Sequence, residues 1–286
     1  MSSGDQESTS APARVDELRK AEILRLRSQP WVWIPLISVP VLTTALFLLQ
    51  VGPGAALISL LVSGLVGLGV IYAVASKRAQ SSFYDLYCQS HGLIRHPDPS
   101  TGGMTPLLRR GEESRTDEAL VGELAPGIEG ALIFWTYTEV SQDQKGRRTE
   151  NDYPFTLIHI EIPEAARHLQ GLRVDRAGFS FLDGLQDKLI GDFRRLQLES
   201  QALDDRFEIF VDKGSDPVWI HRLFAPSFIV WLTESPPDVF AFQFEGGNLI
   251  AYLPGYLEDG ASLEAFSAAG AEVATRLAET ARATRA

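Results

Sequence analysis

The sequence predicts an α+β protein with a two-helix transmembrane hairpin at its N-terminus. A cytoplasmic domain with a mainly antiparallel sheet and packed helices is expected to follow. Two observations lead to this class. Residues 31–76 contain no Asp, Glu, Lys, Arg or His, although 22% of the 286-residue chain is charged. Strand-like and helix-like segments then follow one another beyond residue 118, without the regular alternation of a parallel βαβ sheet.

The uncharged stretch, residues 30–76, has room for two membrane spans. A helix needs about 20 residues to cross a hydrocarbon core of about 30 Å. Segments of about 31–50 and 55–75 both meet that length, and a Gly-Pro-Gly sequence at 52–54 supplies the turn between them. Helices buried in a soluble domain normally keep a polar stripe, which these segments lack. We therefore predict a transmembrane helical hairpin.

Basic side chains flank the predicted hairpin on both sides and are absent from its loop. Five precede the first span, and Lys77 and Arg78 follow the second. Positively charged flanks stay in the cytoplasm. The sequence thus predicts a multi-pass membrane protein with both termini cytoplasmic and with the lipid bilayer as a partner.

A row of small residues lies along one face of the second predicted span. Ala55, Ser59, Ser63 and Gly67 recur every four residues, so another helix backbone can approach them closely. Two interpretations follow: the row packs against the first span of the same chain, or it mediates homo-oligomerisation in the membrane. We favour the first, because a hairpin must pack against itself.

The excess of acidic side chains lies entirely after the hairpin. Residues 1–30 carry equal numbers of basic and acidic side chains and residues 31–76 carry none, so the net charge of −11 belongs to residues 77–286. An acidic body is repelled by anionic lipid and by nucleic-acid phosphates. We predict a domain that projects into the cytoplasm and that has no nucleic-acid partner.

The chain outside the hairpin divides into four predicted segments. Residues 1–13 are small and polar and predict a disordered tail. Residues 14–29 predict a juxtamembrane amphipathic helix. Residues 77–117 predict a helical extension of the second span, which stops at Gly92, and a loop. Residues 118–286 then form the cytoplasmic α+β domain, which is long enough to bury a core of its own.

Local signals within the cytoplasmic domain predict its strands and helices. Aromatic and β-branched runs predict strands, Pro after Asp or Ala predicts helix starts, and Gly-Gly between apolar runs predicts a tight hairpin. The polar stretch 141–152 is expected to be a long solvated hairpin loop. The strands are expected at 131–140, 153–162, 206–212, 239–244 and 248–253, and the helices from Pro217, from Pro226 and over 262–282.

The order of elements over residues 206–253 carries a resemblance to a known family. A strand, an Asp-Pro helix, an Ala-Pro helix and a Phe-rich hairpin that ends in Gly-Asn-Leu follow one another. This order is similar to an uncharacterised bacterial domain-of-unknown-function family of membrane proteins with two N-terminal transmembrane helices and a cytoplasmic α+β domain. The resemblance implies the bacterial inner membrane and brings no catalytic residues. The matching residues are Phe207, Phe210, Asp216, Leu223, Pro226, Phe228, Phe242, Phe244, Asn248 and Leu249.

A search for reactive motifs yields no site. The sequence contains no Gly-x-Ser-x-Gly elbow, no phosphate-binding loop and no His-Glu-x-x-His. Four sets of residues remain, and each also fits an ordinary role: a wet strand face, solvated histidines, an inert thiol and a charged loop tip. They are, in that order, His159 with Glu161; His91 and His96 with Asp98; Cys88; and Arg147 with Arg148. We assign no catalytic, cofactor-binding or metal-binding residue, and we expect no cofactor.

Three functional hypotheses follow. The first is a non-enzymatic, membrane-anchored protein whose cytoplasmic domain serves as an interaction or scaffold module for a protein partner or for a second copy. The alternative is a membrane-tethered hydrolase or ligand-sensing domain with a site built from dispersed residues, of which His159, Glu161 and His221 are the first suspects. A channel of oligomerised hairpins is the weakest, because the first span has no charged or amide side chain before Gln50 to line a pore.

Overall fold

The computed structural model describes residues 15–28, 30–50, 52–96, 104–142, 148–178 and 193–284. The chain forms two compact units, and each is described by itself. The first unit comprises residues 1–87 with 258–260, and the second comprises 88–257 with 261–286. The predicted tail, residues 1–13, lies outside the described residues.

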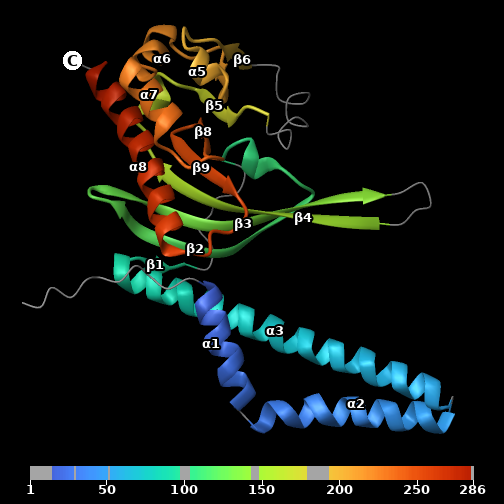
Figure 1. Cartoon of the computed structure of the whole chain (residues 1–286). Helices are drawn as coiled ribbons and strands as arrows, with labels where there is room; N and C mark the ends of the chain where they lie inside the picture. The colour runs from blue at the N-terminus through green and yellow to red at the C-terminus, as the bar shows by residue number, and fades with distance from the viewer. Residues whose placement is uncertain are drawn as a thin grey trace, which may run out of the picture. The chain divides into compact units, whose positions relative to one another are not determined.

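The described residues of the first unit form three helices, α1 (Val15–Ser28), α2 (Pro30–Gln50) and α3 (Pro53–His91). The turn between α2 and α3 contains Gly52, whose φ of 115° is one that residues with a side chain rarely adopt. Figure 1 shows α2 and α3 running in opposite directions on either side of this turn. These helices cover the predicted spans, and α3 continues past residue 76 as the sequence predicts.

One helix among the described residues is both long and apolar enough to cross a membrane, and it is α3. In α2 the apolar residues whose side chains are described run from Ile37 to Gln50. The small residues Ser59 and Gly67 lie on the less exposed side of α3, whereas Leu61 and Leu65 are 60% and 70% exposed. The row of small residues is thus the more covered face of α3.

Helix α1 is held at its N-terminal end by residues from far along the chain. The Val15 N–H donates to the Glu258 carbonyl oxygen at 2.9 Å. The Arg19 guanidinium lies 3.5 Å from the Glu258 carboxylate, and it also stacks over the Tyr72 ring at 5.6 Å. The predicted helix over 14–29 is confirmed as a helix.

The second unit is built on one nine-stranded sheet in which every strand pair is antiparallel (Figure 1). The order across the sheet is β1-β2-β3-β4-β9-β8-β5-β7-β6. This confirms the predicted α+β class with an antiparallel sheet. The strands are β1 (Ile94–Arg95), β2 (Glu113–Ala125), β3 (Ile128–Gln142), β4 (Arg148–Glu161), β5 (Gly171–Arg176), β6 (Phe193–Leu196), β7 (Phe207–Asp212), β8 (Ala241–Glu245) and β9 (Asn248–Pro254).

In the described part of the second unit four helices accompany the sheet, and three of them follow the predicted starts. The Asp216 side chain accepts a hydrogen bond from the Val218 N–H, so it caps the N-terminus of the helix that begins at Pro217, as expected. Gly246 and Gly247 both have positive φ in the tight turn between β8 and β9. The helices are α5 (Gln201–Asp204), α6 (Pro217–Leu223), α7 (Pro226–Glu234) and α8 (Gly260–Ala283).

The expected loop over 141–152 is wrong. Strand β3 continues to Gln142 and β4 begins at Arg148, so the two strands stay paired well beyond the apolar part of the sheet. The polar side chains there bond to one another across the strands: the Thr138 hydroxyl donates to the Asp152 carboxylate at 2.6 Å. A polar composition therefore does not end the ladder here. Strand β2 begins at Glu113, inside the segment 77–117 that is predicted to be a helical extension and a loop.

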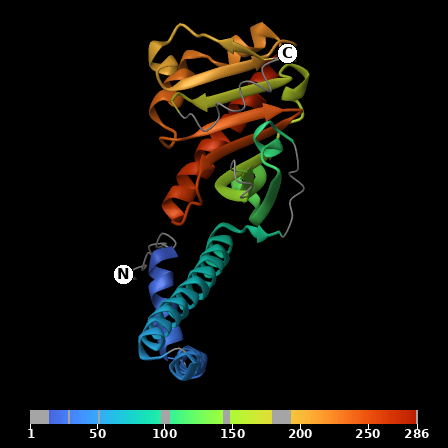
Figure 2. The ribbon, with the colours of Figure 1, turned by 90° about the vertical axis from the view of Figure 1, so that its right-hand side faces the viewer.

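Helix α8 lies along one face of the sheet (Figures 1 and 2). Its Phe266 ring meets Phe240 edge-on at 6.1 Å, and its Gly270 backbone lies directly against Ile158 of β4. The opposite face carries its own cluster of buried side chains from β2, β3, β4, β8 and β9. Leu107 and Leu108, from the connection between β1 and β2, pack against this second cluster.

Replacement of Gly270 by Ala should destabilise the second unit. A Cβ atom at this position would lie 2.8 Å from Ile158 Cδ1 and 3.1 Å from Cγ2. Overpacking costs about 1–3 kcal/mol, against a gain of up to about 1 kcal/mol in helix propensity. We expect a net loss of about 1 kcal/mol in the free energy of unfolding, measured by denaturant titration with circular dichroism.

The double variant Gly270→Ala with Ile158→Val provides the control. Valine lacks the Cδ1 atom that makes the closest contact, so part of the loss should be recovered and the two changes should not be additive. Strict additivity, or a gain in stability from Gly270→Ala alone, would show that α8 does not approach β4 this closely.

Candidate functional site

A group of buried polar side chains interrupts the apolar face of the sheet opposite α8. Arg173 and Asp175 lie two residues apart on β5, so their side chains point to the same face. Gln243 of β8 and Tyr252 of β9 lie on that face as well, and Thr105 precedes the short 3₁₀ helix Leu107–Arg109. All five residues are at most 5% exposed. We call these five residues the polar centre.

The Asp175 carboxylate is the acceptor at the middle of the polar centre. Arg173 Nη2 donates to its Oδ2 atom at 2.6 Å, and the Tyr252 hydroxyl donates to its Oδ1 atom at 2.7 Å. Tyr252 reaches Asp175 across the intervening strand β8, where the residue opposite Tyr252 is Ala241. The small Ala241 side chain leaves room for this contact.

Residues 104–110, which we call the covering segment, are fastened to β8 beside the polar centre. The Leu107 N–H donates to Gln243 Oε1 at 2.9 Å, and the Arg109 guanidinium pairs with Glu245 at 2.5 Å. Further along, Arg110 Nη1 donates to the Tyr137 hydroxyl at 3.2 Å. Thr105 and Leu107 in this segment are fully buried.

Three polar atoms of the polar centre have no hydrogen-bond partner in the described part of the chain. They are Arg173 Nε, Gln243 Nε2 and Thr105 Oγ1. Each is a hydrogen-bond donor, and a buried donor without an acceptor costs about 1–3 kcal/mol. Arg173 and Gln243 are direct neighbours across β5 and β8, and Gln243 also contacts the segment that carries Thr105.

Burial governs the ionisation of the acidic groups in the polar centre. It raises the pKa of Asp175, and the opposing effects of the Arg173 charge and of the Tyr252 hydrogen bond are smaller. Burial also raises the pKa of Tyr252 well above its ordinary value, with the Asp175 charge as the second cause. Tyr252 is thus a protonated donor throughout the physiological range.

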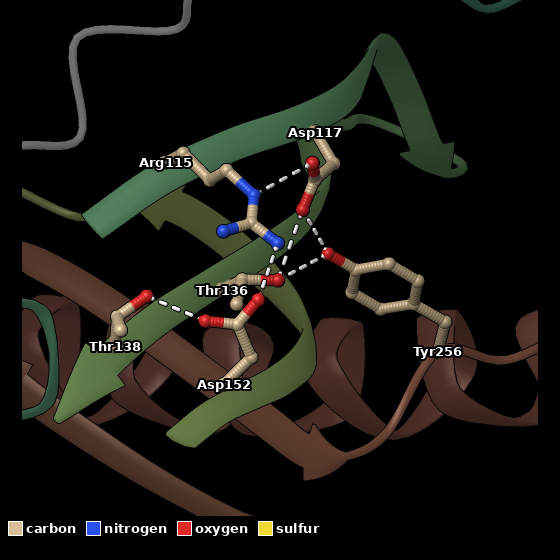
Figure 3. Close-up of polar contacts among 6 residues, drawn as sticks. All are labelled: Arg115, Asp117, Thr136, Thr138, Asp152 and Tyr256. Carbon is tan, nitrogen blue, oxygen red and sulfur yellow. Dashed lines mark hydrogen bonds and ion pairs between the residues drawn. The ribbon is translucent and has the colours of Figure 1, made fainter. Parts of the chain in front are cut away.

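A second polar cluster lies on the α8 side of the sheet, where β2, β3 and β4 extend beyond the apolar core (Figure 3). An extra residue in β2 between Thr116 and Glu118 breaks the register, and this bulge contains Asp117. Figure 3 shows Asp117 and Arg115 turned toward the side chains of β3 and β4. We call this group the polar ledge; it consists of Arg115, Asp117, Thr136, Thr138, Asp152 and Tyr256.

Every side chain of the polar ledge bonds to another member. The Arg115 guanidinium lies 3.1 Å from Asp117 and 2.9 Å from Asp152. The Thr136 hydroxyl donates to Asp117 at 2.9 Å, and the Tyr256 hydroxyl contacts both of these residues. Tyr256 follows β9, so the ledge ties the connection between β9 and α8 to β2 and β3.

The charges of the polar ledge shift the pKa values of its members. The hydrogen bond from Thr138 is the main cause that lowers the pKa of Asp152, and the hydrogen bond from Arg115 adds to it. Burial is the first cause that raises the pKa of Tyr256, followed by its hydrogen bond to Asp117. Both carboxylates of the ledge, Asp117 and Asp152, accept hydrogen bonds from protein donors.

The three residues suspected of forming a hydrolytic or ligand-sensing site are dispersed. His159 Nε2 lies 2.9 Å from the side-chain oxygen of Asn248 on the neighbouring strand β9. This hydrogen bond gives the histidine a structural role. Glu161 is exposed at the end of β4, and His221 is exposed on α6. Among the described residues no contact joins the three side chains, so they do not form a common site.

The other candidates also have local explanations. His91 contacts the Ser90 hydroxyl and lies 3.4 Å from Glu264, whereas Cys88 is a buried thiol. Arg148 pairs with Glu150 on its own strand. Asp98 and Arg147 lie outside the described residues. No group of three or more His, Cys, Asp or Glu residues in the described ranges could hold a metal ion.

The polar centre is the feature that sequence reasoning missed. Its signal is present in the segment Leu172–Arg176, where charged residues alternate with Leu and Val as on a strand. Without the order of strands, however, the segment reads as an exposed edge strand with a charged outer face. In the sheet it is instead an internal strand between β8 and β7, and its Arg173 and Asp175 side chains are buried.

Comparison with known proteins yields one distant structural likeness. No family model matches the chain, and no curated protein matches it. The crystal structure of the mycobacterial trehalose monomycolate transport factor A, TtfA, is similar with a TM-score of 0.42 and 10% sequence identity. The likeness covers 68% of this chain and 90% of that one.

Replacement of Thr138 by Val should raise the pKa of Asp152 toward its ordinary value. The variant removes the hydroxyl that donates to the Asp152 carboxylate, and this bond is the largest cause of the shift. The measurement is a titration of the Asp152 side-chain carboxyl by carbon-detected NMR.

Thr136→Val is the matched control on the same strand. Its hydroxyl bonds to Asp117 and Tyr256 and has no bond to Asp152, so the titration of Asp152 should stay as in the original chain. Equal shifts in both variants would contradict the hydrogen-bond arrangement of the polar ledge.

Proposed function

We propose that this protein is anchored in the bacterial inner membrane through α3 and α2, and that its α+β unit is a cytoplasmic interaction or scaffold module. The observation that carries the proposal is the exposure of α3. Its most apolar 18-residue window has a mean hydropathy of 2.4, and none of that window is buried inside the protein. A core helix of a soluble protein would be covered by its neighbours.

The second span and the topology form part of this proposal. Described leucines on α2, such as Leu42 and Leu49, are 76% and 85% exposed, which water does not favour but lipid does. The basic residues on both flanks of the hairpin support a multi-pass arrangement with both termini in the cytoplasm. Small residues on the more covered face of α3 support packing of the two spans against each other.

An interaction role fits the second unit better than catalysis. The suspected catalytic residues are dispersed, and the carboxylates of the polar ledge already bond to protein donors. The partner would be a protein or a second copy of the chain; the net charge of −11 disfavours nucleic acid. Membership of the two-span membrane family that residues 206–253 resemble is a further part of the proposal.

Replacement of Leu65 by Arg should reduce insertion into the membrane. Leu65 lies near the middle of the apolar part of α3 and is 70% exposed. An arginine at the centre of a span costs about 2.5–3.5 kcal/mol in insertion free energy. We expect a smaller fraction of the protein to resist alkaline extraction from membranes, measured by fractionation and immunoblotting.

Ile94→Arg is the matched control, because Ile94 is equally exposed at 72% but lies in the second unit. This variant should stay in the membrane fraction as the original chain does. Reporter tags at the two termini should both be found on the cytoplasmic side. Equal extraction of both variants, or tags on opposite sides, would contradict the anchoring hairpin.

The interaction role predicts that the protein leaves native membranes as a complex. Affinity purification of the full chain in mild detergent should retrieve one defined protein partner in fixed stoichiometry or a homo-oligomer. Mass spectrometry and multi-angle light scattering provide the readout. A monodisperse monomer with no associated protein would contradict the scaffold role and leave the anchoring role intact.

A further inference from the structure

Strand β4 extends well beyond its neighbour β9 in the sheet (Figure 1). Its pairing with β9 runs from Thr156 to Glu161, whereas its pairing with β3 continues as far as Arg148. Among the described residues, the first part of β4 therefore has a strand on one side only. We call residues 148–152 the open edge of β4. An edge of this kind can pair with a strand of another chain.

The main-chain groups of the open edge point away from β3. The Pro154 carbonyl oxygen accepts a hydrogen bond from the Gly255 N–H at 2.8 Å, on the side of β4 that faces β9. Main-chain groups alternate between the two sides of a strand, so those of Arg148, Glu150 and Asp152 point the same way as those of Pro154. Each of the three offers an N–H donor and a C=O acceptor, and no main-chain bond from the described part of the chain reaches them on this side.

The other edges of this part of the sheet are obstructed. On the outer side of β3 the Val140 N–H already donates to the Glu112 carboxylate at 2.7 Å. Strand β2 carries the bulge at Asp117 and is covered in part by β1. Bulges and capping side chains protect an edge from pairing with another chain. The open edge of β4 has neither, because its register with β3 is continuous.

The charges along the open edge complement a second copy that runs in the opposite direction. In an antiparallel pair centred on Glu150, Arg148 of each copy lies opposite Asp152 of the other, and opposite charges in this position stabilise a sheet. The side chains of Arg148 and Asp152 are 59% and 51% exposed, so both have room for a further contact. Glu150 faces its own copy, but the Arg148 guanidinium of the same strand lies 3.1 Å from its carboxylate and offsets its charge.

We propose that two copies of this chain pair antiparallel along the open edge of β4 and join their sheets into one. The inference rests on the proposed function: it names the surface through which the scaffold module meets a second copy. Anchoring in one membrane raises the effective concentration of the copies. The acidic excess of each copy is screened beyond about 8 Å at physiological ionic strength, so it opposes the contact only weakly.

Reciprocal charge reversals test this pairing. Arg148→Glu places a carboxylate opposite Asp152 of the second copy, and Asp152→Lys places an ammonium group opposite Arg148. Each variant alone should dimerise about tenfold more weakly than the original chain, because two attractive contacts become repulsive. An equimolar mixture of the two variants should regain the dimer, since each changed residue then meets an opposite charge. Multi-angle light scattering of the full chain in detergent, over a range of concentrations, measures the dimer fraction.

Arg194→Glu is the matched control. It makes the same charge reversal at an exposed arginine of β6, at the other end of the sheet, and should leave the dimer unchanged. A mixture that stays monomeric, or single variants that dimerise as the original chain does, would overturn the pairing. A monomeric chain that purifies with a different protein would also overturn it and leave the scaffold role standing, whereas a monomer with no associated protein would overturn both.

Discussion

The exposed apolar surface of α3 is the constraint on which the first unit depends. Each Å² of apolar surface left in water costs about 25 cal/mol. Leu57, Ile58, Leu61, Leu65 and Leu68 of α3 are all at least 60% exposed. Soluble monomers rarely expose contiguous apolar patches of this kind, and such patches mark surfaces that contact a membrane or another protein. A lipid environment removes this cost, and it needs only that the helix satisfies its own backbone hydrogen bonds.

The two faces of the sheet in the second unit are covered by different means. On one face α8 comes so close that Gly270 lies against Ile158 without room for a methyl group. Phenylalanine side chains of β8 and of the residue before it are buried on this face, and the ring of Phe240 meets that of Phe266 on α8. The other face is covered in part by the covering segment, whose attachment includes polar bonds to Gln243 and Glu245. A close-packed helix resists displacement more than a segment held by a few polar contacts.

Short sequence patterns correctly predicted the helix starts and turns that depend on a few neighbouring residues. The Asp216 cap, the Gly246-Gly247 turn and the helix over 262–282 each follow from a few neighbouring residues, and each is confirmed. The expected loop over 141–152 was wrong because backbone pairing between β3 and β4 does not require apolar side chains. Strand β6 was missed, since its four residues have no pattern of their own.

The polar centre could not be predicted for a different reason. Its members come from residues 105, 173, 175, 243 and 252, and they meet only because β9, β8 and β5 are neighbours in the sheet. The order of strands is a property of the whole unit, and nothing near Arg173 in the sequence encodes it. The same holds for the polar ledge, where Tyr256 meets Asp117 from 139 residues away.

The two polar groups differ in how completely they satisfy their own hydrogen bonds. The polar ledge is partly exposed, and its carboxylates, hydroxyls and guanidinium satisfy one another, so its bonds connect strands and the approach to α8. The polar centre is buried, where an unmade hydrogen bond is costly, and yet it leaves three donors unused. Such an arrangement gives up stability that apolar side chains of the same shape would not give up.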